Sequence, residues 1–217
     1  MPWGMKNILV QLFGSSIMEG RLGVDKAADR WYEIMRGQLA ELFPAVCFSI
    51  HNSAVGGESL RELMAHFDTD FTGHTPDFCL AMFAWNNFDM EHPARIVPLA
   101  EQEQLCEAFF RKLPAQTAVI GVIAQPMLDR YHSVNSSHAY DEIRAKYGSV
   151  NAFHDLERDL HRRIFRAHGC PFLDLSKLMA DEPEKYILTA DGIHLSPDGH
   201  RLFATAMTGL VQPLIQP

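Results

Sequence analysis

Four separated segments of this chain contain the residue types that acyl transfer requires. Serines lie in residues 13–20, paired glycines in residues 52–59 and adjacent asparagines in residues 84–87, while Asp191 stands three positions before His194. A serine hydroxyl becomes an effective nucleophile only when a base such as a neutral histidine removes its proton. A carboxylate can hold that histidine in one tautomer, and fixed N–H donors can stabilise the charge that develops on the carbonyl oxygen. Together the four segments predict acyl transfer through a serine.

The first three of these segments each follow a short apolar run of the kind that forms a buried strand. Five such runs are bounded by Gly, Pro or polar residues, and they cover residues 8–13, 46–50, 78–83, 118–124 and 171–175. Short, continuously apolar strands are typical of a parallel sheet that is covered on both faces. The carboxyl ends of parallel strands lie at one edge of the sheet, where ligands bind in such folds. We therefore expect the serines, glycines and asparagines to lie close together.

Amphipathic segments lie between the predicted strands and indicate helices. The predicted helices cover residues 28–42, 60–67, 99–113 and 153–168, and a last helix begins with Pro197 after Ser196 as its N-cap. Ser59 and Glu62 form a capping-box pattern at the start of the second helix. Strands that alternate with helices predict one α/β domain over residues 1–217, a three-layer α/β/α sandwich with a five-stranded parallel sheet. Residues 126–149 are irregular, and we expect either a surface excursion near the site or a loose segment.

Charge and composition exclude several classes of partner. The chain has 217 residues with 19 basic and 27 acidic side chains, a formal charge of -8. This balance argues against nucleic acid and against an anionic membrane surface, since both attract clustered Lys and Arg. No apolar run is long enough to span a bilayer, and the N-terminal apolar stretch is too short for a secretory signal. We expect a cytoplasmic protein whose four widely spaced cysteines are free thiols.

The four segments resemble the motifs of the SGNH hydrolases, also called GDSL esterases and lipases, in the same order along the chain. The resemblance implies a flavodoxin-like fold, hydrolysis of esters and no cofactor. It places Ser16 at the nucleophile and Asp191 and His194 at the other two triad positions. It also assigns the oxyanion hole to the N–H group of Ser16 together with Gly57 and Asn86.

Three residues depart from the usual family motifs. Ser15 stands where the first motif usually has Asp, and Asn87 stands where the third motif usually has Asp. Ala84 stands where the third motif usually has Gly. We expect the second departure to cost a local hydrogen bond and to leave the chemistry intact. Ser16 has an alternative reading as the N-cap of the helix after the first strand, because serine is a favoured cap residue.

Two aromatic residues beside the third motif are candidates for substrate contact. Trp85 and Phe88 follow the third predicted strand, where an acyl chain or the alcohol part of an ester could lie, and core packing is the alternative for both. We also expect no metal site. His154, His161 and His168 recur every seven residues, which places them too far apart for one zinc ion. The charged residues between them favour a solvated helix face, and we expect a surface role for His200.

These inferences lead to one expected function and three alternatives. The expected function is a serine esterase that cleaves small acyl esters, with acetyl groups on carbohydrates as the leading substrate, through a covalent acyl-enzyme. A lipid acylhydrolase or a thioester acylhydrolase would use the same triad. A binding module that kept the fold and lost turnover is the alternative from another class. Small-molecule esters are the only expected partners, and the sequence does not indicate an oligomeric state.

Overall fold

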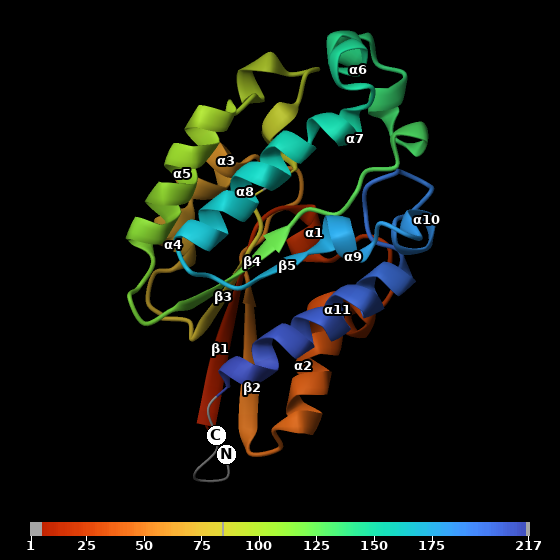
Figure 1. Ribbon diagram of the computed structural model, residues 1–217. Helices are drawn as coiled ribbons and strands as arrows, with labels where there is room; N and C mark the ends of the chain where they lie inside the picture. Colours follow the sequence, from red (N-terminus) through yellow and green to blue (C-terminus); the bar gives the residue numbers. More distant parts are fainter. Residues whose placement is uncertain (1–5, 84, 216–217) are drawn as a thin grey trace.

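The computed structural model describes residues 6–83 and 85–215. They contain a five-stranded sheet with the strand order β2-β1-β3-β4-β5, in which every pairing of neighbours is parallel (Figure 1). The strands are β1 (Lys6–Phe13), β2 (Val46–Asn52), β3 (Phe78–Ala81), β4 (Ala118–Ile123) and β5 (Phe172–Asp174). The predicted five-stranded parallel sheet is confirmed, and its order is the flavodoxin-like one.

Helices cover both faces of this sheet. The α-helices are α1 (Ser16–Glu19), α2 (Trp31–Leu42), α3 (Leu60–Ala65), α4 (Phe67–Asp70), α5 (Leu99–Lys112), α6 (Asp141–Tyr147), α7 (Val150–Phe153), α8 (Asp155–Ala167), α9 (Leu175–Leu178), α10 (Pro183–Tyr186) and α11 (Pro197–Val211). Helices α2 and α11 pack together on one side, while α3, α5 and α8 lie on the other (Figure 1). The three predicted layers are therefore present.

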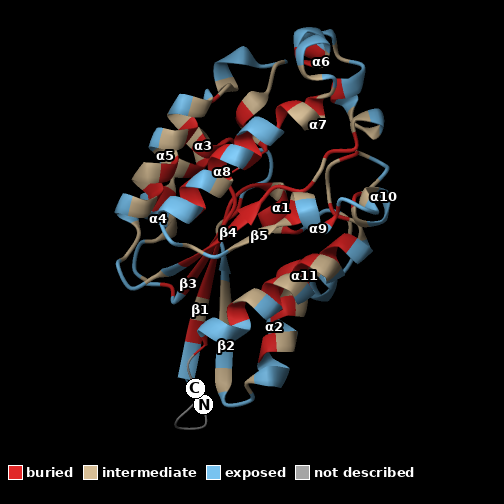
Figure 2. Ribbon diagram, in the orientation of Figure 1, coloured by how far each residue is buried: buried red, intermediate tan, exposed pale blue. Residues whose placement is uncertain are grey.

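Two apolar clusters separate the layers, and side chains of one strand point alternately into each of them. Leu12 belongs to the cluster under α2 and α11, and its neighbour Phe13 belongs to the cluster under α3 and α5. This alternation follows from the two-residue period of a strand. Figure 2 shows the buried residues concentrated along the central strands and on the inner sides of the helices.

Two predicted helix starts are confirmed by their capping bonds. Ser59 and Glu62 form the capping box at α3, and the Ser196 hydroxyl accepts from the Gly199 N–H at α11. The predicted helix through Phe67 is wrong in one respect, because α3 ends at Ala65 and a separate short helix, α4, begins at Phe67. Residues 126–149 form a surface excursion of three short 3-10 helices and α6.

The solvated face predicted for α8 is wrong. His154 and His161 are 4% and 1% exposed, and Arg158 between them is 1% exposed. The helix turns this face toward the sheet, where the guanidinium of Arg158 donates to the Ala124 and Gln125 carbonyl groups. His168, at the end of the helix, does lie at the surface.

The surface role predicted for His200 is also wrong, because its side chain is 1% exposed. Its Nδ1 accepts from the Trp31 N–H at 3.1 Å, and its Nε2 donates to the Leu22 carbonyl at 2.8 Å. These two bonds fix the tautomer of His200 and attach α11 to the segments before and at the start of α2. The residue is a buried structural histidine.

Candidate active site

The first motif places Ser16 at the end of β1, as the first residue of α1. Ser15 occupies the N-cap position without a side-chain capping bond, so the capping role considered for Ser16 does not apply. The turn depends on Gly14, whose φ is +150° and where a Cβ would lie 2.9 Å from the Met82 carbonyl oxygen. The Ser15 side chain is fully buried, while Ser16 is half-buried and reaches the sheet edge. The neighbouring serines therefore have different surroundings.

His194 and Asp191 lie next to Ser16, although the chain separates them from it by more than 170 residues. The His194 Nε2 atom is 3.0 Å from the Ser16 Oγ, and the His194 Nδ1 is 2.9 Å from the Asp191 Oδ2. With a carboxylate at Nδ1, the neutral imidazole carries its proton there and presents an unprotonated Nε2 to the serine. This is the arrangement that general-base activation of a serine requires.

The Asp191 carboxylate is held by its own loop. Its Oδ1 accepts from the backbone N–H groups of Ile193 and His194 at 2.9 and 3.0 Å. Burial acts to raise the pKa of Asp191, but these N–H groups and the His194 ring outweigh it and hold the pKa below its ordinary value. Gly192 has φ of +75°, and a Cβ there would lie 2.6 Å from the Leu128 carbonyl oxygen. The loop geometry therefore requires glycine between Asp191 and the histidine.

The glycine-rich turn after β2 lies over Ser16. A Cβ at Gly56 would be 3.6 Å from the Ser16 Cβ, and Gly57 has φ of +83° with no atom near its own Cβ position. Asn86 approaches from the loop after β3 and donates from Nδ2 to the Glu58 carbonyl at 3.0 Å. An amide nitrogen has two N–H groups, so this bond positions the side chain and leaves a second donor. The glycine turn thus lies beside Ser16, and Asn86 is bonded to the same turn; the oxyanion-hole role of Gly57 and Asn86 stays a prediction.

Arg95 was not singled out by the sequence, although it joins the two loops that carry Gly57 and Asn86. Its Nη2 donates to the Gly57 carbonyl at 2.5 Å and to the Glu62 carboxylate at 3.0 Å, and its Nη1 donates to Asp89 at 3.2 Å. The Arg95 guanidinium lowers the pKa of Glu62 to about 2. Nothing in the local sequence distinguishes this arginine from a solvated one.

Asn87, the second departure from the family motif, is fully buried and has three hydrogen bonds. Its Oδ1 accepts from the Leu60 N–H at 2.8 Å, and its Nδ2 donates to the Phe83 carbonyl at 2.7 Å and to the Glu157 carboxylate at 2.9 Å. The expected loss of a local hydrogen bond is therefore wrong. An amide suits this position because Glu157, from α8, is an acceptor.

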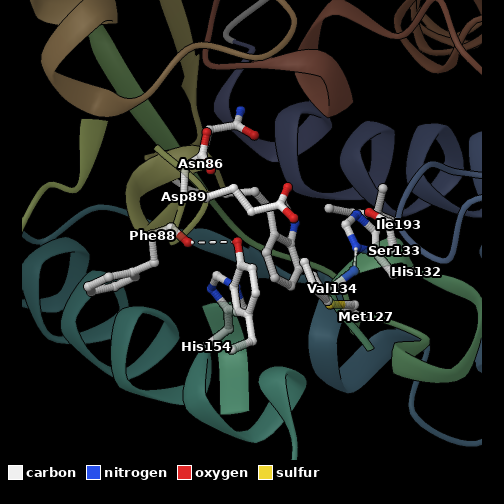
Figure 3. A pocket seen from close by; sticks show the side chains of 12 residues that line it. Asn86, Phe88, Asp89, Met127, His132, Ser133, Val134, His154 and Ile193 are labelled. Atoms are coloured by element: carbon white, nitrogen blue, oxygen red, sulfur yellow. Dashed lines mark hydrogen bonds between the residues drawn. The ribbon is translucent and has the colours of Figure 1, made fainter. Parts of the chain in front are cut away.

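A cavity of about 170 Å³ lies beside these residues (Figure 3). Asn86 and Ile193, the residue before His194, line it, so the cavity adjoins the group of residues around Ser16. Both aromatic candidates also line it: Trp85 is 5% exposed and packs as part of the core, while Phe88 is half-buried. Ala84, which belongs to the third motif, lies outside the described residues.

Within residues 6–83 and 85–215, no group of three or more His, Cys, Asp or Glu side chains is arranged to hold a metal ion. None of the helices in the same part of the chain is both long and apolar enough to cross a membrane.

The sheet order and the Ser16–His194–Asp191 chain are those of an α/β hydrolytic enzyme, and comparison with known proteins identifies the family. Residues 12–202 match the model of the GDSL-like Lipase/Acylhydrolase family. The chain belongs to this family and is a carboxylic ester hydrolase. No curated protein sequence matches it.

Solved structures show the same fold at low sequence identity. A lipase/acylhydrolase from Enterococcus faecalis superimposes with a TM-score of 0.75 at 17% identity, covering 97% of this chain and 98% of the other. An acetyl xylan esterase superimposes with a TM-score of 0.70 at 20% identity, covering 94% and 100%. A variant of an acetyl xylan esterase from Geobacillus stearothermophilus gives 0.69 at 17% identity, covering 94% of each chain. These similarities concern the fold.

Proposed function

We propose that the protein is a serine esterase that removes small acyl groups, above all acetyl, from hydroxylated alcohols such as carbohydrates. In this mechanism Ser16 attacks the carbonyl carbon, while His194 takes the hydroxyl proton and later delivers it to the departing alcohol oxygen. Asp191 holds the histidine in the reactive tautomer. The continuous Ser16–His194–Asp191 chain, with contacts of 3.0 and 2.9 Å, is the observation that carries this proposal.

Three N–H donors complete the proposed site. The backbone N–H groups of Ser16 and Gly57 and the free amide N–H of Asn86 stabilise the negative oxygen of the tetrahedral intermediate. Loss of the alcohol leaves an acyl group on Ser16, and water activated by His194 then releases it as the acid. Every step uses groups of this chain, and the proposed partner is the small ester alone.

The acetyl preference and the compartment are part of the same proposal. The acetyl preference is supported by the acetyl xylan esterases among the structures of similar fold. The four cysteines are free, which fits a reducing compartment, and we propose the cytoplasm. A lipid or thioester acylhydrolase is the second candidate, on the same triad. Rates on aryl esters of increasing acyl length distinguish them, because an acetylesterase loses rate as the acyl chain grows.

The test of the nucleophile uses the two adjacent serines as variant and control. Ser16→Ala should lower kcat for 4-nitrophenyl acetate by about 10⁴- to 10⁶-fold, as for other triad serines. Ser15→Ala should lower kcat far less, because the Ser15 side chain is buried in the turn. A fluorophosphonate probe followed by peptide mass spectrometry should label Ser16. A label on Ser15, or an active esterase with neither serine labelled, would contradict the assignment, and an unlabelled protein without esterase activity would support the binding-module alternative.

A further inference from the structure

The cavity next to the site contains a second histidine–carboxylate pair that the proposed mechanism does not use. His154 lines the cavity and is 4% exposed (Figure 3). Its Nδ1 lies 2.6 Å from the Glu157 Oε2, and the other oxygen of Glu157 accepts from Asn87. Because the carboxylate takes the Nδ1 proton, the neutral ring presents Nε2 as an acceptor. Within the described part of the chain, no residue bonds to this Nε2.

The orientation of the His154 ring is fixed from several sides. Its ring lies edge-on to Trp85, with the ring centroids 4.3 Å apart, and Phe88 and Phe153 pack beside it. The guanidinium of Arg158 also lies over the Trp85 ring, 5.1 Å from the ring centroid. An acceptor held by packing and by a buried carboxylate loses little freedom when a ligand binds, so it is suited to recognition.

One hydrogen-bond donor lines the same cavity. The His132 Nδ1 accepts from the Val134 N–H at 3.2 Å, which leaves the proton of the neutral ring on Nε2. Burial lowers the pKa of His132, so the ring is neutral near pH 7. The cavity thus combines one fixed acceptor with one neutral donor.

The remaining polar wall of the cavity is acidic. Asp89 and Glu91 line it, and no Lys or Arg does among the residues that the structure describes. Arg95 lies outside this lining and pairs with Asp89 at 3.2 Å, but it is shared with Glu62. The carboxylates therefore outnumber the cation, which disfavours an anionic lipid headgroup. A long hydrocarbon chain would leave the His154 acceptor and the His132 donor without partners, and a desolvated polar group without a partner is costly. A hydroxyl group, which both donates and accepts, satisfies the cavity.

We propose that this cavity binds the alcohol part of the ester and that His154 accepts a hydrogen bond from a free hydroxyl next to the acylated oxygen. The inference rests on the proposed function and narrows it to esters of vicinal diols, the pattern of a partly acetylated sugar. His154 is a specificity-determining residue in this scheme, and Glu157 positions it. Asn86 and Ile193, the residue before His194, line the same cavity, so an alcohol bound there lies next to the proposed site.

The first experiment compares two acetates that differ by one hydroxyl, on the unmodified enzyme. The substrates are trans-2-hydroxycyclohexyl acetate and cyclohexyl acetate, with 4-nitrophenyl acetate as a measure of triad function. We expect kcat/KM to be about tenfold or more higher for the hydroxylated ester, the value of one well-placed hydrogen bond. Equal kcat/KM values with normal hydrolysis of 4-nitrophenyl acetate would overturn this inference alone. Failure to hydrolyse any of the three esters would overturn the proposed function and, with it, this inference.

The second experiment assigns the preference to His154. His154→Phe keeps the aromatic contact with Trp85 and removes both nitrogens, so the preference should fall to near one while hydrolysis of 4-nitrophenyl acetate persists. His168→Phe makes the same exchange at the exposed end of α8, outside the cavity, and should leave the preference intact. An equal loss on all three esters in His154→Phe would show a structural role and overturn the assignment.

Glu157→Gln covers the case in which His154→Phe does not fold. The amide can still accept from Asn87, but it offers an N–H to the His154 Nδ1 and moves the imidazole proton to Nε2. The preference for the hydroxylated ester should then fall while the protein still shows a cooperative thermal unfolding transition. An unchanged preference in a folded Glu157→Gln protein would overturn the proposed acceptor role.

Discussion

The Asn87→Asp substitution restores the residue usual in the family motif and should nevertheless destabilise this protein. The new oxygen would stand where Nδ2 now lies, 2.9 Å from the Glu157 Oε1 and 2.7 Å from the Phe83 carbonyl oxygen. Two donated hydrogen bonds become contacts between acceptors, in a place where Asn87 is fully buried and Glu157 is 1% exposed. Leaving a buried charge without its partner typically costs about 3–5 kcal/mol. We expect a decrease of this size in the free energy of unfolding at pH 8.

The pH dependence of the Asn87→Asp variant gives a second, independent check. Two adjacent buried carboxyl groups share a proton, so the folded variant binds more protons than the unfolded chain near neutral pH. Its stability should therefore fall as pH rises, and the deficit against the unmodified protein should be smaller at pH 5 than at pH 8.

A double-mutant cycle with Glu157→Gln isolates the contact. Because the glutamine amide can donate to the new carboxylate, the double variant should recover about 1–3 kcal/mol relative to the sum of the single effects. Urea unfolding of the four proteins, at both pH values, gives the coupling energy. A variant Asn87→Asp that is as stable as the unmodified protein at pH 8, with no coupling to position 157, would refute this account of the network.

Three further predictions follow from other contacts of the site and core. Asp191→Asn should fold and lose about 10⁴-fold in kcat, as in the serine-protease case, because the amide favours the wrong tautomer of His194; near-normal kcat would remove Asp191 from the triad. Arg95→Gln should lower kcat more than it raises KM, because the Gly57 peptide loses its guanidinium donor, and equal kcat in a steady-state assay would contradict the positioning role. Burial lowers the pKa of His161 from 6.5 to about 4, so unfolding, which releases this ring to take a proton, becomes easier as pH falls below 6.5. Between pH 7.5 and 5, protonation of this ring on unfolding should cost the unmodified protein about 2 kcal/mol of unfolding free energy, at roughly 1.4 kcal/mol per pH unit below 6.5. The His161→Phe variant should not show this part of the decrease. A pH profile parallel to that of the unmodified protein in urea titrations would contradict the prediction.

The fold was predictable because its signals are local. Short apolar strands, apolar helix stripes and the capping residues Ser59 and Ser196 each depend on neighbours in the sequence. The place of Ser16 at the sheet edge was also predictable, since the strand ends of a parallel sheet meet there. Asp191 and His194 follow no strand, and their placement beside Ser16 was expected from the resemblance to the family motifs. The roles given to these residues in catalysis stay predictions until the nucleophile is tested.

The buried polar groups could not be predicted in the same way. Charged and imidazole side chains on α8 form a pattern typical of a solvated face, yet Arg158 and His154 are buried. Arg158 donates to backbone carbonyls after β4, which only the tertiary structure brings within reach. His154 pairs with Glu157, three residues on, and it is the packing of α8 on the sheet that buries this local pair. His200 was misplaced for the same reason, because its two hydrogen-bond partners precede it by more than 160 residues.

The attachment of α11 to the start of α2 has a consequence for when the enzyme can work. The loop with Asp191 and His194 directly precedes α11. Helix α11 packs against the first third of the chain through the hydrogen bonds of His200 and the stacked rings of Trp31 and Phe203, whose centroids are 4.1 Å apart. Domains fold as their chains emerge from the ribosome, N-terminal parts first. A nascent chain that has completed all five strands would still hold an unactivated serine. Ester hydrolysis would thus begin only when α11 has docked against α2, after all five strands have formed.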